Sequence, residues 1–275
     1  MFYCEEFRIG HQNIIGVDFD NKTLDSIINC INKIKIYSNC IDYGILLEYD
    51  LTDFLNYIPA TNVSDRTDFI HLNSKLLNWL SAFYLWKSSL SKEIKEPFEE
   101  IQTRFRSQEN QIYRLVDEIR NYSAHRGFAI NKRIFDFISE KSSYYICSKE
   151  LLLFLDNKKS NGNKINAKFY DFIKRKVYDE EDIEAYELTS NFKKTYLQMH
   201  DELWNRIKND IHNDLIKIFS ILPPGFSNVY NISIVSNDQL THINIGHILC
   251  QFLEKIETRY NDAIPDIYAG KFKSH

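Results

Sequence analysis

Apolar residues recur every three or four positions along most of this chain, which is the spacing of one face of an α-helix. Only 8 glycines and 5 prolines occur among 275 residues, so few positions interrupt these runs. The two clearest runs predict long helices over 68–94 and 189–221, the second of which is stopped by Pro223 and Pro224. The sequence therefore predicts a mainly α fold, an antiparallel helical bundle with small β additions. The two apolar stripes are Phe69, Leu72, Leu76, Leu80, Phe83, Trp86 and Leu90, and Phe192, Tyr196, Met199, Leu203, Ile207, Ile211, Leu215 and Ile218.

The remaining elements give weaker signals, which divide the chain into three segments of one globule. Segment 1–65 is expected to be an α/β extension packed on the core, 66–221 the helical core, and 222–275 a β-hairpin followed by a helix. The expected elements are a strand at 13–17, helices at 24–37 and 45–58, strand or short helix at 142–147 and 151–155, a loop at 158–163, a helix at 166–177, hairpin strands at 229–235 and 240–245, and a helix at 246–260.

Charge and cysteine usage restrict the possible partners and the compartment. The net charge of −4 provides no general positive field, so any nucleic-acid contact must be a local patch of cations. The sequence has neither a cationic start followed by an apolar run nor an apolar stretch of membrane-spanning length, so we expect no membrane insertion. The cysteines are odd in number, scattered and without a Cys-x-x-Cys pair, which favours a reducing cytoplasm. They are Cys4, Cys30, Cys40, Cys147 and Cys250.

The segment from Pro97 to Gly127 predicts a single amphipathic helix that forms an antiparallel hairpin with the helix at 68–94. Pro97 suits a first turn, and Gly127 suits a left-handed C-cap. Side chains that form hydrogen bonds fall on one face, within an arc of roughly 140°. This face lacks the mixture of lysine and glutamate that is usual on a plain exterior. It consists of Arg106, Asn110, Tyr113, Arg114, Asp117, Arg120, Asn121 and His125.

The end of this predicted helix combines an arginine with a histidine. A guanidinium group can hold a phosphate through a planar pair of donors, and an imidazole can transfer protons near neutral pH. Arg120 and His125 lie about 140° apart on an ideal helix, which aims them poorly at one phosphate. Either the last turn loosens near Gly127, or two copies of the helix meet at a dimer axis. Asn121 and His125 are i,i+4 neighbours, so the amide can orient the imidazole or contact the substrate.

The run Arg120-Asn121-Tyr122-Ser123-Ala124-His125-Arg126-Gly127 resembles the signature of HEPN-domain proteins, an arginine and a histidine separated by four to six residues. The resemblance covers about residues 66–220 and implies a helical bundle of HEPN type. It implies Arg120 and His125 as a catalytic pair, with Asn121 as the polar residue after the arginine, in the composite site of a homodimer. The implied activity is a metal-independent endoribonuclease that uses the 2′-OH of RNA and needs no cofactor, typical of toxins and antiphage effectors with an antitoxin or regulatory partner.

Other cations near this motif are candidates for contacts with the RNA backbone: Arg106, Arg114, Arg126, Lys132 and Arg133. Two alternatives to the ribonuclease hypothesis remain open. The first is a non-catalytic HEPN module that binds a nucleotide, a nucleic acid or a protein partner. The second is a purely structural helical protein, in which Arg120 pairs with Asp117 or Glu118.

Two further patterns resemble known sites but fit ordinary structure better. Asp18, Asp20, Thr23 and Leu24 resemble the first motif of haloacid-dehalogenase-type phosphatases, but one extra residue separates Asp20 from Thr23 and the expected βαβ units are missing. As a calcium loop, the same stretch would put Lys22 at a ligand position. His242, His247 and Cys250 could hold zinc, but no fourth ligand is evident. We therefore expect no metal site.

Overall fold

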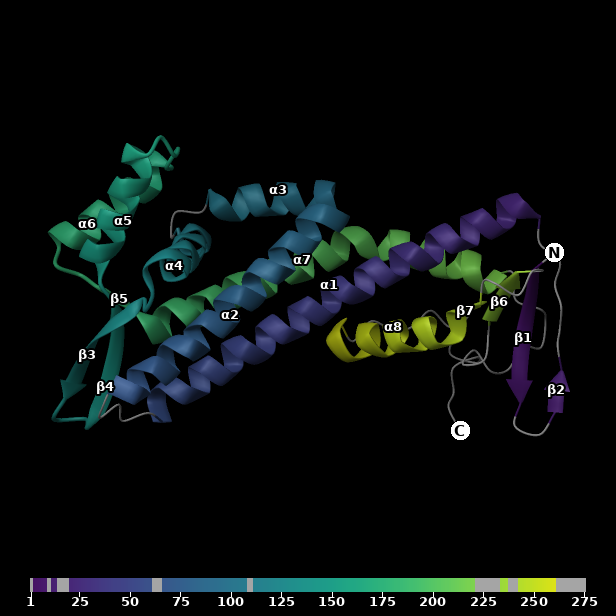
Figure 1. Cartoon of the computed structure of the whole chain (residues 1–275), viewed down its shortest axis with the longest axis horizontal. Helices are drawn as coiled ribbons and strands as arrows, with labels where there is room; N and C mark the ends of the chain where they lie inside the picture. Colours follow the sequence, from purple (N-terminus) through teal and green to yellow (C-terminus); the bar gives the residue numbers. More distant parts are fainter. Residues whose placement is uncertain are drawn as a thin grey trace. The chain divides into compact units, whose positions relative to one another are not determined.

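Helices dominate the computed structural model, which describes residues 2–8, 11–13, 20–60, 66–107, 111–220, 233–236 and 242–260 (Figure 1). The predicted mainly α class with small β additions is confirmed. Contacts divide the chain into two compact units, one made of 1–41 with 207–275 and the other of 42–206. The unit boundaries fall inside helices α1 (Asn21–Ala60) and α7 (Ala185–Ser220), whereas the segments expected from the sequence met at loops.

Helix α1 is continuous where two helices were predicted, at 24–37 and 45–58. The prediction was wrong because Gly44 and its polar neighbours interrupt the apolar periodicity without breaking the helix. Gly44 is buried, and its carbonyl oxygen accepts a hydrogen bond of 2.8 Å from the Tyr196 hydroxyl. A Cβ atom at position 44 would lie 2.9 Å from that hydroxyl oxygen and 3.1 Å from Nε2 of His200. Glycine therefore permits close approach of α1 to α7 within the unit 42–206.

Gly44→Ala should destabilise the protein although alanine is the better helix former. The propensity gain is at most about 1 kcal/mol, whereas a methyl group forced against the buried Tyr196 costs about 1–3 kcal/mol. Chemical denaturation would measure the change in the free energy of unfolding. The control is Gly162→Ala in the loop after α5. A Cβ atom at position 162 meets nothing within 4 Å, so this variant has the backbone strain of a positive φ, 80°, without a steric clash. A Gly44→Ala protein more stable than the parent would contradict the packing argument.

The predicted helix from Pro97 to Gly127 is two helices. After α2 (Arg66–Glu93), α3 spans Lys95–Arg106 and α4 spans Ile112–Arg126. Ser107 ends α3, and Gln111 before α4 has a φ of 54°, which a continuing helix cannot contain. Pro97 does lie in the first turn of α3. Gly127 does cap α4, with a φ of 101°, but its ψ of −135° lies outside the left-handed helical region that was predicted.

A three-stranded antiparallel sheet follows α4, with the order β3 (Ile130–Asp136), β4 (Lys141–Ile146) and β5 (Ile183–Glu184). The strand expected at 142–147 is β4, whereas β3 was not predicted. Between β4 and β5 lie α5 (Ser148–Ser160) and α6 (Ala167–Tyr178), which pack against each other. The segment 151–155 is therefore helical, and α5 continues into the expected loop at 158–163. Helix α6 confirms the helix expected near 166–177 and is capped by the Asn166 side chain.

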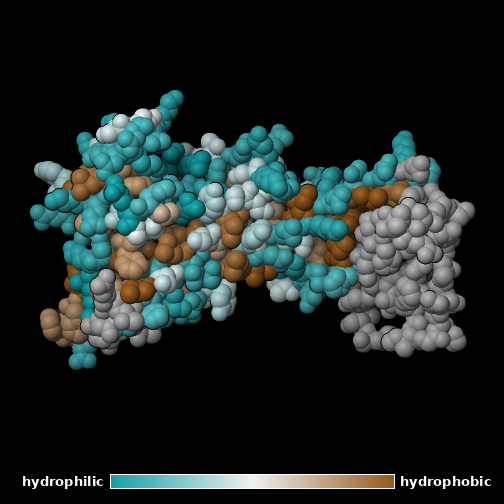
Figure 2. Space-filling view, in the orientation of Figure 1, coloured by the Kyte–Doolittle hydropathy of each residue, from teal (hydrophilic) through white to brown (hydrophobic). Residues whose placement is uncertain are grey.

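The loop between β3 and β4 presents apolar side chains, which gather at the tip of this hairpin in Figure 2. Phe137 and Ile138 are 85% and 97% exposed. The Asp136 carboxylate accepts hydrogen bonds from the backbone N–H of Ile138 and from the hydroxyl of Ser139. Both hydrogen bonds lower the pKa of Asp136, and the bond from Ser139 has the larger effect. The loop thus holds its two apolar side chains outward through one carboxylate.

The core of the unit 42–206 is an aromatic cluster between α2 and α7. The rings of Phe83 and Phe192 lie 4.9 Å apart and those of Trp86 and Tyr196 lie 5.1 Å apart, both edge to face. Tyr113 of α4 joins the cluster, 5.4 Å from Phe83. All five rings are almost fully buried. This cluster anchors the first turn of α4 and so fixes the helix that carries the candidate site.

The other unit contains a four-stranded sheet and α8 (Ile245–Tyr260). The strand order is β2 (His11–Asn13), β1 (Phe2–Arg8), β6 (Ser233–Ser236) and β7 (His242–Asn244). The predicted hairpin in the last segment is confirmed where β6 pairs with β7, whereas 229–232 and 237–241 lie outside the described residues. The pairing of β6 with β1 was not predicted. Of the strand expected at 13–17, Asn13 belongs to β2 and 14–17 lie outside the described residues. Asp20 accepts a hydrogen bond from the Thr23 N–H and so acts as an ordinary helix cap.

Candidate functional site

Helix α4 carries the predicted catalytic residues (Figure 1). Its buried side includes Leu115, Val116 and Ile119, which hold the helix on the core. Arg120 and Asn121 are half-buried, whereas His125 in the last turn is exposed. The apolar spacing on this short helix therefore sets which of the polar side chains reach the surface.

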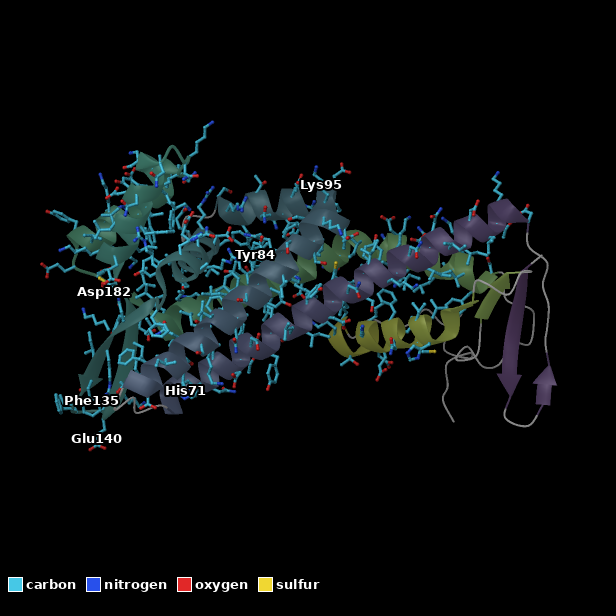
Figure 3. All side chains as sticks on the ribbon, in the orientation of Figure 1. His71, Tyr84, Lys95, Phe135, Glu140 and Asp182 are labelled. Carbon is cyan, nitrogen blue, oxygen red and sulfur yellow. The ribbon has the colours of Figure 1, made fainter. Side chains whose placement is uncertain are left out.

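Arg120 lies on an aromatic ring of α2. Its guanidinium carbon is 4.1 Å from the ring centroid of Tyr84, which Figure 3 labels, and its Nη1 donates a long hydrogen bond of 3.5 Å to Oδ1 of Asn121. Asp117 and Glu118, the acidic partners considered for Arg120, pair with other cations. The stacking leaves part of the guanidinium group able to bind an anion.

Asp117 is the acidic centre of the contacts between α2, α3 and α4. It accepts hydrogen bonds from Lys87 of α2 and, at 3.2 Å, from Arg106 of α3. One residue further along, Glu118 pairs with Lys158 of α5 at 2.6 Å. Because each carboxylate has a cationic partner, the negative charge next to Arg120 is largely neutralised.

Two residues assigned to the hydrogen-bonding face, Tyr113 and Arg114, lie instead at the junction of α3 and α4. Tyr113 is fully buried and accepts a hydrogen bond of 2.8 Å from Gln102, and burial, with a smaller effect of Asp117, raises its pKa far above the usual value. Its assignment to the polar face was wrong because Phe83 of α2 and Gln102 of α3 cover that face at the first turn of α4. Arg114 donates to the backbone oxygen of Arg106 at 2.6 Å. Asn110 lies outside the described residues.

His125 is the exposed end of the predicted catalytic pair. Among the described residues its side chain has no hydrogen-bond or ion-pair partner. Asn121 accepts from Arg120, so in this conformation it orients the arginine and not the imidazole. Arg126 follows His125 and is also exposed. The last turn of α4 therefore exposes an imidazole and a guanidinium group at consecutive positions.

A small pocket of about 240 Å³ lies beside this turn, between α4 and α5. Arg126 and Asn157 line it, together with Tyr122, whose hydroxyl donates a hydrogen bond of 2.7 Å to Glu150. Burial, followed by this hydrogen bond and the charge of Glu150, raises the pKa of Tyr122 to about 12. Tyr122 therefore stays protonated at neutral pH and supports the end of α4.

Lys132 and Arg133 lie on β3 and are engaged within the protein. Lys132 pairs with Asp182 at 2.7 Å. The Nε of Arg133 donates a hydrogen bond of 2.9 Å to the Ser142 hydroxyl, and its guanidinium group lies 5.5 Å from the ring of Phe135. Five cations were predicted to bind RNA. Arg126 is exposed on α4, Arg106 and Arg114 lie at the α3–α4 junction, and Lys132 and Arg133 lie on β3.

Tyr84 is the member of the site that the sequence did not single out. It is 43% exposed on the outer face of α2, next to the core residue Phe83. An exposed aromatic side chain on a helix is a weak signal, and nothing in the sequence couples it to Arg120. The contact depends on the packing of α2 against α4.

In the part of the chain that the structure describes, no cluster of three or more His, Cys, Asp or Glu side chains could hold a metal ion. None of the helices described there combines the length and apolar character needed to cross a membrane. Comparison with protein-family models, curated proteins and solved structures gives no match to this chain.

Proposed function

We propose that this protein is a metal-independent endoribonuclease of HEPN type, acting as a toxin or antiphage effector. One observation carries the proposal: an exposed imidazole at His125 ends the helix on which the half-buried Arg120 is held against Tyr84. An accessible imidazole and a positioned guanidinium group are the two groups that cleavage through the ribose 2′-OH requires.

The chemistry follows from the properties of these two side chains. An imidazole of His125 accepts the proton of the 2′-OH as its oxygen attacks the adjacent phosphorus. An imidazolium then donates a proton to the leaving 5′-oxygen. Arg120 stabilises the negative charge that builds up on the phosphate oxygens. The products are a 2′,3′-cyclic phosphate and a 5′-hydroxyl group, and DNA resists because it lacks the 2′-OH.

A homodimer would bring Arg120 and His125 side chains together at one phosphate, which a single helix cannot do. Helix α4 keeps its helical conformation through Arg126, so Arg120 and His125 stay five positions, or about 140°, apart. This argues against the alternative of a loosened last turn. In a two-fold dimer, the same face of α4 from both copies meets at the axis and combines four functional groups.

We expect a dimer in solution at assay concentration, measurable by sedimentation or light scattering. Adding a like charge to this cationic face, as in Ala124→Arg at an exposed position of α4, should weaken the association of the two copies and therefore cleavage. Ala124→Ser is the control of similar exposure. Full activity from a demonstrably monomeric protein would contradict the composite site.

Cleavage should persist in EDTA and show a bell-shaped dependence on pH. One imidazole must be neutral to accept a proton while another group is charged to donate one, so activity falls at both extremes. The experiment incubates the protein with total RNA, and with DNA as a control, and identifies the chemical ends of the products. Strict dependence on Mg²⁺, or cleavage of DNA at the same rate, would overturn the proposal. RNA binding without cleavage would favour the non-catalytic alternative.

A further inference from the structure

A second pocket lies on the unit 42–206, away from the predicted catalytic pair. Its volume is about 780 Å³, within the range of small-molecule sites. It is lined by β3, β4 and β5, by α6, and by the first turns of α4 and α7. Its apolar lining includes Leu115, Tyr145, Phe172, Ile183 and Leu188. A ligand could therefore bury an apolar body of moderate size here.

The polar lining of this pocket carries excess negative charge. Five carboxylates line it together with two lysines. Lys132 pairs with Asp182, labelled in Figure 3, and Lys176 pairs with Glu181 at 3.0 Å. The other three carboxylates, of Glu180, Glu184 and Glu187, form no ion pair among the described residues. The pocket is thus apolar inside and negative at its rim.

Glu184 is the least exposed of these three carboxylates. It is half-buried, and it accepts a hydrogen bond of 2.5 Å from the backbone N–H of Glu187 at the start of α7. Burial raises the pKa of Glu184, and the charge of Glu187 raises it further, although backbone hydrogen bonds oppose the change. A cation next to Glu184 would offset both unfavourable effects.

Two ammonium groups in the pocket wall each lie near one aromatic ring and one carboxylate. The Nζ of Lys132 lies 6.0 Å from the ring centroid of Tyr145, and the Nζ of Lys176 lies 5.7 Å from that of Phe172. Each of these lysines also contacts a carboxylate. The same chemistry suits a cation that enters from outside.

We propose that this pocket binds a small organic cation, an ammonium group attached to an apolar body. The ammonium group lies between Glu184 and Glu187, and the apolar body covers Leu188 and the aromatic lining. The carboxylates repel phosphates, so this site excludes RNA. Lys132, which was predicted from the sequence to bind RNA, is part of the wall of this pocket. The proposal does not depend on ribonuclease activity.

Three probes that share one carbon skeleton test the charge requirement: 4-phenylbutylamine, 4-phenylbutan-1-ol and 4-phenylbutyrate. Titration calorimetry of the full chain should show the amine binding about tenfold more tightly than the alcohol, with the carboxylate weakest. Amide chemical shifts should change at the residues that line the pocket. Equal binding of all three probes, or no binding of the amine at millimolar concentration, would overturn the proposal.

Glutamate-to-glutamine variants, which keep the shape of the side chain and remove its charge, test whether the amine binds in this pocket. Glu184→Gln keeps an acceptor for the Glu187 N–H, and Glu187→Gln changes an exposed side chain, so both should fold. Each should reduce the affinity for the amine toward that for the alcohol, whereas Glu257→Gln on α8 should leave it unchanged. Wild-type affinity in both pocket variants would place the amine elsewhere and refute the assignment. RNA cleavage, measured in parallel, reports separately on the α4 site.

Discussion

His125→Ala should abolish RNA cleavage and any toxicity to growing cells. The imidazole would transfer protons on both sides of the reaction, and loss of general acid–base catalysis typically costs about 10²–10⁴ in rate. The substitution should leave the fold unchanged because His125 is exposed at the end of α4, outside the core. The thermal unfolding of the variant should therefore match that of the parent, within about 0.5 kcal/mol of stability.

His71→Ala provides the matched control for this variant. His71 is also exposed on a helix, on α2, and Figure 3 shows it near the start of that helix. Its loss should leave both cleavage and stability unchanged. Rates would be compared on one RNA substrate under single-turnover conditions, so that product release does not mask the chemical step. Wild-type cleavage by His125→Ala would remove His125 from the mechanism.

The long helices were predictable because their local signals agree with their packing. In α2 and α7 the apolar positions named from spacing, such as Leu76 and Phe192, are buried, except for Phe69, which is half-buried. Local signals failed where tertiary contacts decide the outcome. Gly44 looks like a helix break but serves close packing against Tyr196, and the break after Arg106 lacks any glycine or proline signal.

The sheets show a second limit of sequence patterns. Strand β1 pairs with β6 near the other end of the chain, and no short-range periodicity reports such a partner. Strand β3 begins with Ile130, whose backbone N–H and C=O are both satisfied by the side chain of Asn73 on α2. The sequence does not show that the side-chain amide of a helical residue will hydrogen-bond to the edge of a strand. This contact becomes visible only in the folded structure.

For the candidate site, the sequence proposes residues but does not predict their surroundings. Arg120 and His125 stand on one helix that ends at Gly127, as predicted. Tyr84 was missed because its contact with Arg120 crosses from α2 to α4. Lys132 was assigned to RNA because it is a cation close to the motif in sequence. Its partner Asp182 lies fifty positions away, so its place in an acidic pocket could not be foreseen.

Arg120→Lys should lower the chemical rate by about a hundredfold or more while keeping the charge. An ammonium group cannot form the planar pair of hydrogen bonds to phosphate, and it stacks less well on an aromatic ring than a guanidinium group does. The loss should fall mainly on kcat, because the contact strengthens as charge develops in the transition state. Arg175→Lys, at an exposed position of α6, is the control and should retain full activity.

The Tyr84 ring tests whether the position of the guanidinium group matters as well as its chemistry. Tyr84→Phe keeps the ring 4.1 Å from Arg120 and should retain activity, whereas Tyr84→Leu removes the π face and should lower kcat with little change in stability. If Tyr84→Leu left kcat intact while Arg120→Lys lost it, the arginine would act without its aromatic support. An Arg120→Lys enzyme as fast as the parent would mean that phosphate is held by a different residue, and Arg126 at the exposed end of α4 would be the first to replace.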